Sequence, residues 1–319
     1  MRAAVWTKFG PPDVLELQEV ERPAPGEDEL LIKVHAASIN SWDWELMKGE
    51  AQITFGGRLR PKYKILGCDV AGVVEDIGRN VKGFKLGDEV FGDISGSDWG
   101  GFAEYVCAKE RVMALKSPKM SFEQAAATPQ AAVLALQGLR DKGDIRQGQR
   151  VLINGAGGGV GTFAVQIAKS FGAEVTGVDF TDKLEMLRSI GADRVIDCSK
   201  EDFTRMDREY DLIVDVMSQR SIFDYKRALA PKGVCVLVGG SAGAIFPAMI
   251  FGSWVLWGKK VRVLLLRPNS EDLAHINDLF EIGKLIPIID GCYALDDIAE
   301  AFRYYIEGRV KGKIVITVP

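Results

Sequence analysis

The chain has 319 residues, a formal net charge of −4 and 47% hydrophobic residues, a composition typical of a soluble globular α/β protein. This length accommodates two domains with sizeable cores. The slightly negative charge and the lack of a basic cluster argue against a nucleic-acid partner. The most apolar stretch, Ala244 to Trp257, is too short to span a bilayer, so stable membrane insertion is not expected. We interpret it as core, pocket wall or subunit contact, with a peripheral membrane contact as the alternative.

The beginning of the chain and its cysteines indicate a cytoplasmic protein. Met1 leads directly into a strand-like segment, so no signal peptide is expected. The five cysteines form no CxxC pair and have no metal-ligand spacing. We therefore expect reduced, mostly structural thiols.

The first third of the chain is predicted to be β-rich. Apolar alternation and Gly/Pro turns place strands at residues 1–6, 15–20, 30–36, 70–76, 89–92 and 103–107. Short strands at this spacing are typical of a small barrel. An alanine-rich helix is predicted over residues 121–138 and leads into the next domain.

Residues 150–180 carry the strongest functional signal. The apolar run 151–153 is typical of a buried parallel strand, and a glycine cluster and a helical pattern follow it. A second apolar run, 175–178, ends at Asp179. This βαβ unit contains the motif Ala156-x-Gly158-x-x-Gly161 in the place of the dinucleotide fingerprint G-x-G-x-x-G.

The residue types of this unit match the chemistry of a dinucleotide. Gly158 lets a pyrophosphate approach, Gly161 allows close packing of helix on strand, and the helix start offers free N–H groups. Asp179 follows at roughly the 20-residue spacing at which an acid accepts ribose hydroxyls. The residues expected to bind the cofactor are Ala156, Gly158, Gly159, Val160, Gly161, Asp179 and Lys183.

From residue 150 onward, predicted strands and helices alternate, which implies a doubly wound parallel sheet. The strands are placed at 151–154, 174–179, 194–197, 211–216 and 233–239. An amphipathic helix over 295–307 and a last strand over 313–318 are expected to return to the first domain.

Several segments in this order resemble the medium-chain dehydrogenase/reductase superfamily, and most closely its zinc-independent quinone oxidoreductase (zeta-crystallin-like) branch. They are HAASINSWDWELMKG, ILGCDVAGVVEDIG, LGDEVFG, GGFAEYV, the nucleotide unit and VKGKIVITV. The resemblance covers essentially the whole chain. It implies an α/β protein in which a catalytic GroES-like β-barrel domain (1–121 and 267–319) accompanies a Rossmann nucleotide-binding domain (122–266).

The zinc-dependent alcohol dehydrogenases of the superfamily need a Cys/His ligand set with one open position. Here the matching positions hold Asn40 for the first Cys, Cys68 for His and Asp69 for Glu, with Gln130 near the last Cys. The four-cysteine structural lobe is missing as well. We therefore expect no zinc.

Without a metal, another group has to stabilise charge on a carbonyl oxygen during hydride transfer. The resemblance places Asn40 at the nicotinamide and the substrate oxygen, where its amide could donate a hydrogen bond. The alternative is a turn residue between strand and helix, a position that Asn favours. For Asp43, we favour capping and anchoring of the helix that begins near Ser41 over a role in the site.

The cofactor is expected to be NADH rather than NADPH. A carboxylate at Asp179 repels a 2′-phosphate and accepts ribose hydroxyls. Asp182 stands where NADPH-using relatives tend to have a basic side chain. Lys183 and Arg150 compensate this repulsion in part.

The resemblance implies hydride transfer from NAD(P)H to a quinone or an α,β-unsaturated carbonyl. One alternative is an alcohol dehydrogenase that acts oxidatively, and another is a nicotinamide-binding sensor or structural protein with low turnover. The substrate is expected between the domains, against aromatic and apolar groups. The candidates are Trp42, Trp44, Phe55 and the segment around Trp254. Relatives form homodimers through an edge strand of the nucleotide domain, and residues 234–266 could supply that contact.

Overall fold

The computed structural model describes residues 1–49, 61–96, 99–239 and 258–319. The chain forms two compact units. Unit 1 comprises residues 1–130, 268–281 and 287–319, and unit 2 comprises residues 131–267 and 282–286.

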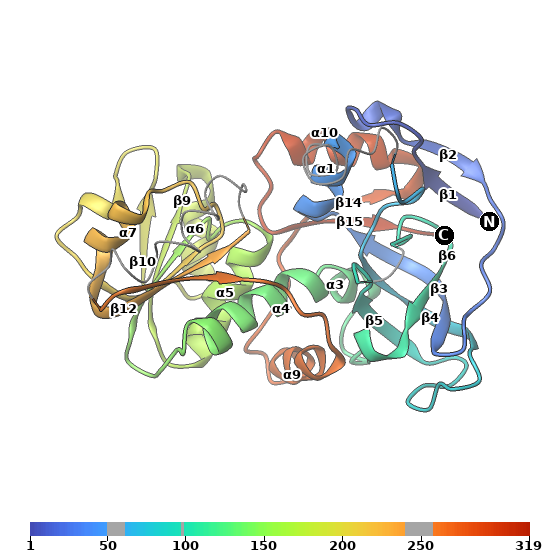
Figure 1. Ribbon diagram of the computed structural model, residues 1–319, viewed down its shortest axis with the longest axis horizontal. Helices are drawn as coiled ribbons and strands as arrows, with labels where there is room; N and C mark the ends of the chain where they lie inside the picture. The colour runs from blue at the N-terminus through green and yellow to red at the C-terminus, as the bar shows by residue number, and fades with distance from the viewer. Residues whose placement is uncertain (50–60, 97–98, 240–257) are drawn as a thin grey trace. The chain divides into compact units, whose positions relative to one another are not determined.

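Unit 1 is built on a seven-stranded sheet (Figure 1). Its strands are β3 (Glu29–Ser38), β4 (Asp69–Ile77), β5 (Glu89–Asp93), β6 (Tyr105–Lys109), β7 (Met113–Leu115), β14 (Ile289–Ala294) and β15 (Lys313–Thr317). They pair in the order β14-β15-β3-β4-β5-β7, and β6 also pairs with β3. The β-rich first third is thus confirmed, and the chain returns to it as predicted, because β15 pairs antiparallel with β3.

A second sheet and four helices make up the rest of the described part of unit 1. The sheet joins β1 (Arg2–Val5) to β2 (Glu16–Glu19) in antiparallel register. The helices are α1 (Ser41–Lys48), α3 (Phe122–Ala126), α9 (Ser270–Glu281) and α10 (Ile298–Ile306), and short 3-10 turns occupy Pro12–Val14, Glu110–Val112 and Leu295–Asp297.

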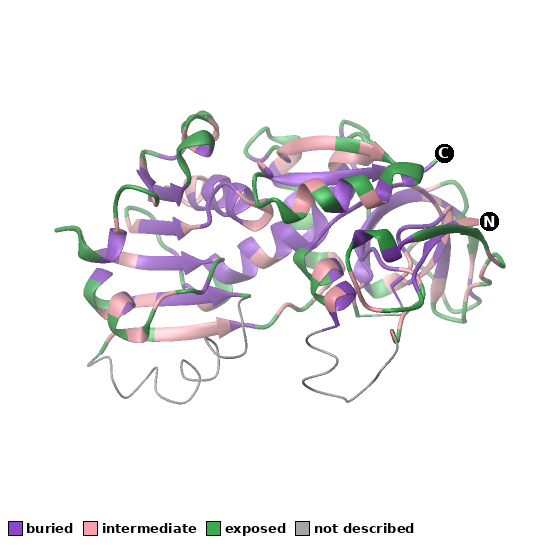
Figure 2. Ribbon diagram, turned by 90° about the horizontal axis from the view of Figure 1, so that it is seen from above, coloured by how far each residue is buried: buried purple, intermediate pink, exposed green. Residues whose placement is uncertain are grey.

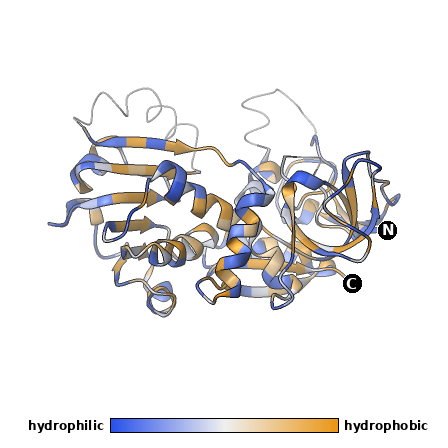
Figure 3. Cartoon of the chain, turned by 90° about the horizontal axis from the view of Figure 1, so that it is seen from below, coloured by the Kyte–Doolittle hydropathy of each residue, from blue (hydrophilic) through white to orange (hydrophobic). Residues whose placement is uncertain are grey.

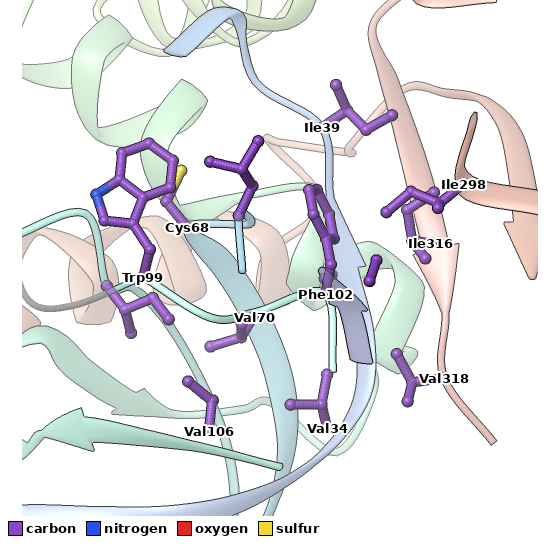
Figure 4. Close-up of a cluster of buried hydrophobic side chains, with 14 of the residues drawn as sticks. Val34, Ile39, Cys68, Val70, Trp99, Phe102, Val106, Ile298, Ile316 and Val318 are labelled. Carbon is purple, nitrogen blue, oxygen red and sulfur yellow. The ribbon is translucent and has the colours of Figure 1, made fainter. Parts of the chain in front are cut away.

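Strand β3 is buried on both faces. Leu30, Ile32 and Val34 alternate as predicted, but Leu31 is also buried, at 3% exposure. On the face of Leu31, the ring of His35 stacks on Phe122 of α3, so this helix covers the second face of the strand. The apolar core of unit 1, shown in Figure 4, includes Ile39, Cys68, Val70 and Phe102.

The helix predicted over 121–138 is in fact two helices, α3 and α4 (Pro129–Gln137). The break precedes Pro129, which lacks a backbone N–H and disfavours helical geometry in the residue before it. Helix α3 packs on β3 and β4, and it belongs to unit 1, which includes residues up to Gln130.

Unit 2 is a parallel six-stranded sheet of the doubly wound type, as predicted. Its strands are β8 (Arg150–Asn154), β9 (Glu174–Asp179), β10 (Arg194–Asp197), β11 (Tyr210–Asp215), β12 (Leu229–Val238) and β13 (Lys260–Leu264). Their order, β10-β9-β8-β11-β12-β13, is that of a dinucleotide-binding fold, in which the order reverses between β8 and β11. The inner strands are buried, whereas the end strand β13 is largely of intermediate burial (Figure 2).

The helices of unit 2 are short. Among the described residues they are α4, most of which belongs to this unit, α5 (Gly159–Ser170), α6 (Leu184–Ser189) and α7 (Ile222–Ala228), with a π-helical turn at Gly138–Lys142 and 3-10 turns at Thr181–Lys183 and Phe203–Arg205. The strands of the parallel sheet carry mostly hydrophobic residues, drawn orange in Figure 3.

No helix among the described residues is long and apolar enough to cross a membrane. The apolar stretch 244–257 lies outside the described residues.

Three strands have no counterpart in the sequence prediction: β7, β13 and β14. β7 has only three residues and lies at the end of the sheet path, where it pairs with β5 alone on that path. β14 has the sequence IDGCYA and is intermediate to exposed throughout, so it lacks the regular apolar alternation by which strands are recognised.

Candidate functional site

The glycine turn of unit 2 has the geometry of a dinucleotide-binding loop. β8 ends at Asn154, Gly155 adopts a positive φ of 79°, and Gly158 is the residue that precedes helix α5. The backbone N–H groups of Gly155 and Ala156 both donate to the carbonyl of Val178, 3.0 and 3.1 Å away. These two hydrogen bonds tie the turn to β9. The first N–H groups of α5, which have no partner within the helix, lie at the start of that helix.

Gly161 is the residue on which the closure of this turn depends. A Cβ at this position would lie 2.2 Å from the carbonyl oxygen of Gly155 and 2.5 Å from Cα of Ala156. Both are backbone atoms and cannot move aside. Gly158 differs, since a Cβ there would meet only the oxygen of Gly155, at an ordinary 3.6 Å. Gly161 therefore serves packing, whereas Gly158 leaves space at the helix start, directly before Gly159 and Val160 begin α5.

Asp179 and Lys183 lie against the turn and are both buried, with side chains 7% and 8% exposed. Oδ2 of Asp179 accepts a hydrogen bond of 2.7 Å from the N–H of Gly157. Nζ of Lys183 is 3.7 Å from Oδ1 of the same carboxylate. The carboxylate is therefore placed at the end of β9 and beside the glycines, and the lysine lies on it as a counter-charge.

Sequence reasoning missed a second polar group at the strand ends of unit 2. Asp215, fully buried at the end of β11, accepts from Nδ2 of Asn154 (3.0 Å) and from the hydroxyl of Tyr225 (2.7 Å). It also accepts from the N–H groups of Met217 and Ser218. Asn154 and Asp215 end the two strands between which the sheet order reverses, where ligands bind in folds of this type. The sequence feature that could have indicated Asp215 is an acidic residue at the end of an apolar strand.

Unit 1 contains a buried polar cluster around Asn40, which is the N-cap residue of α1 and 7% exposed. Nδ2 of Asn40 donates to Oδ2 of Asp69 at 2.8 Å and to Sγ of Cys68 at 3.3 Å. Oδ1 of Asn40 accepts from the ammonium of Lys313. Both the oxygen and the nitrogen of the amide are thus hydrogen-bonded within the protein. Asn40 therefore connects β3 to α1 and also belongs to the polar cluster.

Asp69 and Lys313 form the charged centre of this cluster, at 0% and 3% side-chain exposure. Nζ of Lys313 lies 3.3 Å from Oδ2 of Asp69 and 3.1 Å from the carbonyl of Ile39. Asp69 also accepts from the hydroxyl of Ser38 at 3.1 Å and from the N–H of Gln130 at 2.9 Å. Lys313 was missed by sequence reasoning, although a lysine at the start of an apolar C-terminal strand was a usable signal.

Two further carboxyls border the cluster. Asp43 anchors α1, because its carboxylate accepts from the N–H groups of Asn40 (2.8 Å) and Gly67 (2.9 Å), which supports the anchoring role favoured above. Burial raises the pKa of Asp43 to about 7, and burial together with Asp69 raises that of Asp93 to about 7. Oδ2 of Asp93 has no partner among the described residues.

Cys68, Asp69 and Asp93 are the residues that a metal ion would use, since their donor atoms lie within 4.8 Å of one another. They do not fit zinc. Burial, followed by the neighbouring carboxylates, raises the pKa of the Cys68 thiol well above its usual value, whereas zinc binds the thiolate. Both oxygens of Asp69 already accept hydrogen bonds, and the ammonium of Lys313 would repel a second cation.

The predicted aromatic wall is described only in part. Trp42 is exposed (58%), and Trp44 is partly buried against the core of unit 1. Phe55 and the segment around Trp254 lie outside the described residues.

Comparison with known proteins agrees with this architecture. Residues 26–119 match the family model described as alcohol dehydrogenase GroES-like domain, and residues 190–316 match the one described as zinc-binding dehydrogenase. The chain is 36% identical to the 2-methylene-furan-3-one reductase of Solanum lycopersicum, over 99% of this chain and 79% of that protein. It is 32% identical to the chloroplastic NADPH-dependent alkenal/one oxidoreductase of Arabidopsis thaliana, over the same shares.

Among solved structures, the quinone oxidoreductase from Coxiella burnetii superposes with a TM-score of 0.90 at 30% identity, over 100% of this chain and 99% of that one. The two plant reductases and the Coxiella burnetii enzyme each match 99–100% of this chain, and so they match both of its units. The chain therefore belongs to the medium-chain dehydrogenase/reductase superfamily, in its quinone oxidoreductase-like branch, as a two-domain α/β oxidoreductase with a GroES-like domain and a Rossmann domain.

Proposed function

We propose that this protein transfers a hydride from a reduced nicotinamide cofactor to a quinone or an α,β-unsaturated carbonyl, with the Asn40 amide as the group that stabilises charge on the acceptor oxygen. The names of the relatives support the reaction class. The observation that carries the proposal is the buried Asn40 amide, which a lysine holds at one end and which has a weak sulfur acceptor at the other.

Unit 2 provides the residues that would hold the cofactor, which supplies the hydride when it is bound. The start of α5, kept open by Gly158, suits the pyrophosphate. The carboxylate of Asp179 suits the ribose hydroxyls. With these roles, the pyrophosphate accounts for the glycine at position 158, and the ribose accounts for the acid at position 179.

Asn40 would act on the other reactant. One hydrogen of its Nδ2 is bonded to Cys68 Sγ at 3.3 Å, and a thiol sulfur is a weak acceptor. An acceptor oxygen that gains negative charge is a better partner, so it can replace the sulfur while the bond to Asp69 remains. A proton from water then completes the reduction.

Replacing Asn40 by alanine is expected to lower kcat/KM for the acceptor by about 100-fold, since loss of one preorganised donor to a developing oxyanion typically costs 10²–10³. Steady-state kinetics with an enone and a quinone measure the effect. The control is Glu45→Gln, an exposed substitution in the same helix. Activity of N40A equal to that of E45Q would exclude Asn40 as the donor. Cofactor affinity and thermal unfolding of both variants separate this loss from a loss of the helix cap.

We also propose that NADH is preferred over NADPH, by at least about tenfold in kcat/KM, which corresponds to about 1.4 kcal/mol. The buried Asp179 carboxylate beside Gly157 supports this choice, although Lys183 offsets part of its charge. Asp182 is exposed, so Asp182→Arg should fold normally and shift the ratio of the two kcat/KM values toward NADPH. A tenfold preference of the unaltered protein for NADPH would reverse the assignment.

We propose further that no zinc takes part. The support is the donor set described above. Burial raises the pKa of the Cys68 thiol, both oxygens of Asp69 accept hydrogen bonds, and the ammonium of Lys313 lies beside them. Elemental analysis should find no stoichiometric zinc, and dialysis against a chelator should leave enone reduction unchanged. Bound zinc together with zinc-restored, alcohol-dependent reduction of NAD would favour an oxidative alcohol dehydrogenase instead.

We propose that the protein is a cytoplasmic homodimer. β13 ends the parallel sheet, and Leu265 directly after it is 73% exposed, so this strand could pair with a second copy. All five cysteines are free thiols, which suits a reducing compartment.

A further inference from the structure

Lys313 is a buried cation, and the free energy needed to remove its charge from water calls for an explanation. Its side chain is 3% exposed and comes from β15, 273 residues along the chain from Asn40. Burying an ion pair often contributes no net stability, because desolvation offsets the Coulomb attraction. A neutral side chain of similar size could have filled the same space.

All three hydrogens of the ammonium have acceptors in the cluster. They lie toward Oδ1 of Asn40, the carbonyl of Ile39 and Oδ2 of Asp69. A lysine ammonium offers three donors and no acceptor. The three contacts therefore account for its full bonding capacity, and they fix its position at the end of β3.

The ammonium determines which way the Asn40 amide points. Since it can only donate, the oxygen of the amide has to face it, and the NH₂ group then faces Asp69 and Cys68. A positive charge at the amide oxygen also draws electron density from the nitrogen, which makes its N–H groups stronger donors.

We propose that Lys313 is a positioning residue that orients and polarises the Asn40 amide, and that it thereby extends the reaction from easily reduced quinones to weakly electrophilic enones. This inference rests on the proposed function. In it, Lys313 acts through Asn40 and does not itself touch the acceptor.

The two acceptor classes need this assistance to different degrees. In an enone, the hydride forms a C–H bond at the β-carbon, the C=C electron pair moves toward the carbonyl and leaves an enolate oxygen, and a proton from water then adds to the α-carbon. In a quinone, the two electrons of the hydride produce an aromatic hydroquinone anion, which takes its proton from water. The nicotinamide is oxidised in both reactions. Aromatisation drives the second, so only the first depends strongly on stabilisation of the oxygen.

The test compares Lys313→Met with Lys313→Arg, which retains the charge, and with Lys311→Met, a matched lysine two residues earlier. Since K313M leaves Asp69 buried without its cation, a double variant, Lys313→Met with Asp69→Asn, keeps the cluster neutral and the comparison valid. Each protein is assayed for kcat and KM with one enone and one benzoquinone at saturating cofactor, and cofactor Kd is measured separately.

We expect the double variant to lose about 100-fold in kcat for the enone, in line with loss of oxyanion stabilisation, but less than about tenfold for the quinone. Cofactor Kd should not change, K313R should exceed K313M in enone turnover, and K311M should match the unaltered protein. Equal losses for both acceptors, or no loss, would overturn the role of Lys313. Failure of the unaltered protein to reduce either acceptor would instead refute the proposed function, and the inference with it.

Discussion

Asp69→Ala is expected to lower the free energy of unfolding by about 3–5 kcal/mol, because removing one partner of a buried ion pair leaves an uncompensated charge. The ammonium of Lys313 would remain in a site where its side chain is 3% exposed. The hydroxyl of Ser38 and the N–H of Gln130 would lose their acceptor at the same time. Urea unfolding followed by tryptophan fluorescence gives the difference.

The matched control for this prediction is Asp76→Ala on the same strand. Asp76 is exposed and accepts only from the N–H of its neighbour Ile77 among the described contacts. Exposed substitutions of this kind usually change stability by less than about 0.5 kcal/mol. Equal effects of D69A and D76A would mean that the cluster contributes nothing to folding.

Gly161→Ala is expected to destabilise the protein by about 3 kcal/mol, at the upper end of the usual cost of overpacking, since the added methyl meets backbone on two sides. Its Cβ would lie 2.2 Å from the oxygen of Gly155 and 2.5 Å from Cα of Ala156. The strand, the turn and α5 would have to separate. Chemical denaturation measures the loss, and Gly138→Ala, whose Cβ meets nothing closer than 3.5 Å, is the control.

Gly158→Ala separates the two functions of the glycine motif. Its Cβ fits at 3.6 Å from the nearest atom, so stability should stay within about 1 kcal/mol of the unaltered protein. Cofactor affinity should nevertheless fall by about tenfold or more, because the methyl occupies the space that a pyrophosphate needs at the helix start. Unchanged cofactor Kd in G158A, measured by fluorescence titration, would show that this glycine does not face the pyrophosphate.

The features that could be read from the sequence are those with a local cause. The alternation of strands and helices after residue 150 was recognisable because each element has its own periodicity and the connections are short. Gly158 and Gly161 were recognisable because a tight turn before a helix restricts residue type within a few positions. The break before Pro129 was equally local, and the prediction of one helix over 121–138 missed it.

The polar cluster could be predicted only in part. Asn40, Cys68 and Asp69 were singled out by position, but nothing in their neighbourhoods indicates that the Asn40 amide is bonded at both ends. Asp93 and Asp215 had to be found in the structure, because an acid after a strand is a common turn residue and only burial distinguishes these two.

By itself, the sequence determined the two kinds of domain, the nucleotide motif and the place of Asn40 between a strand and a helix, because each follows from residue preferences within one or two elements. The tertiary structure alone decided that Lys313 meets Asn40 and Asp69. That contact requires β15 to pair with β3 across most of the chain. Such long-range pairing depends on the packing of the whole sheet, and no short stretch of residues determines it.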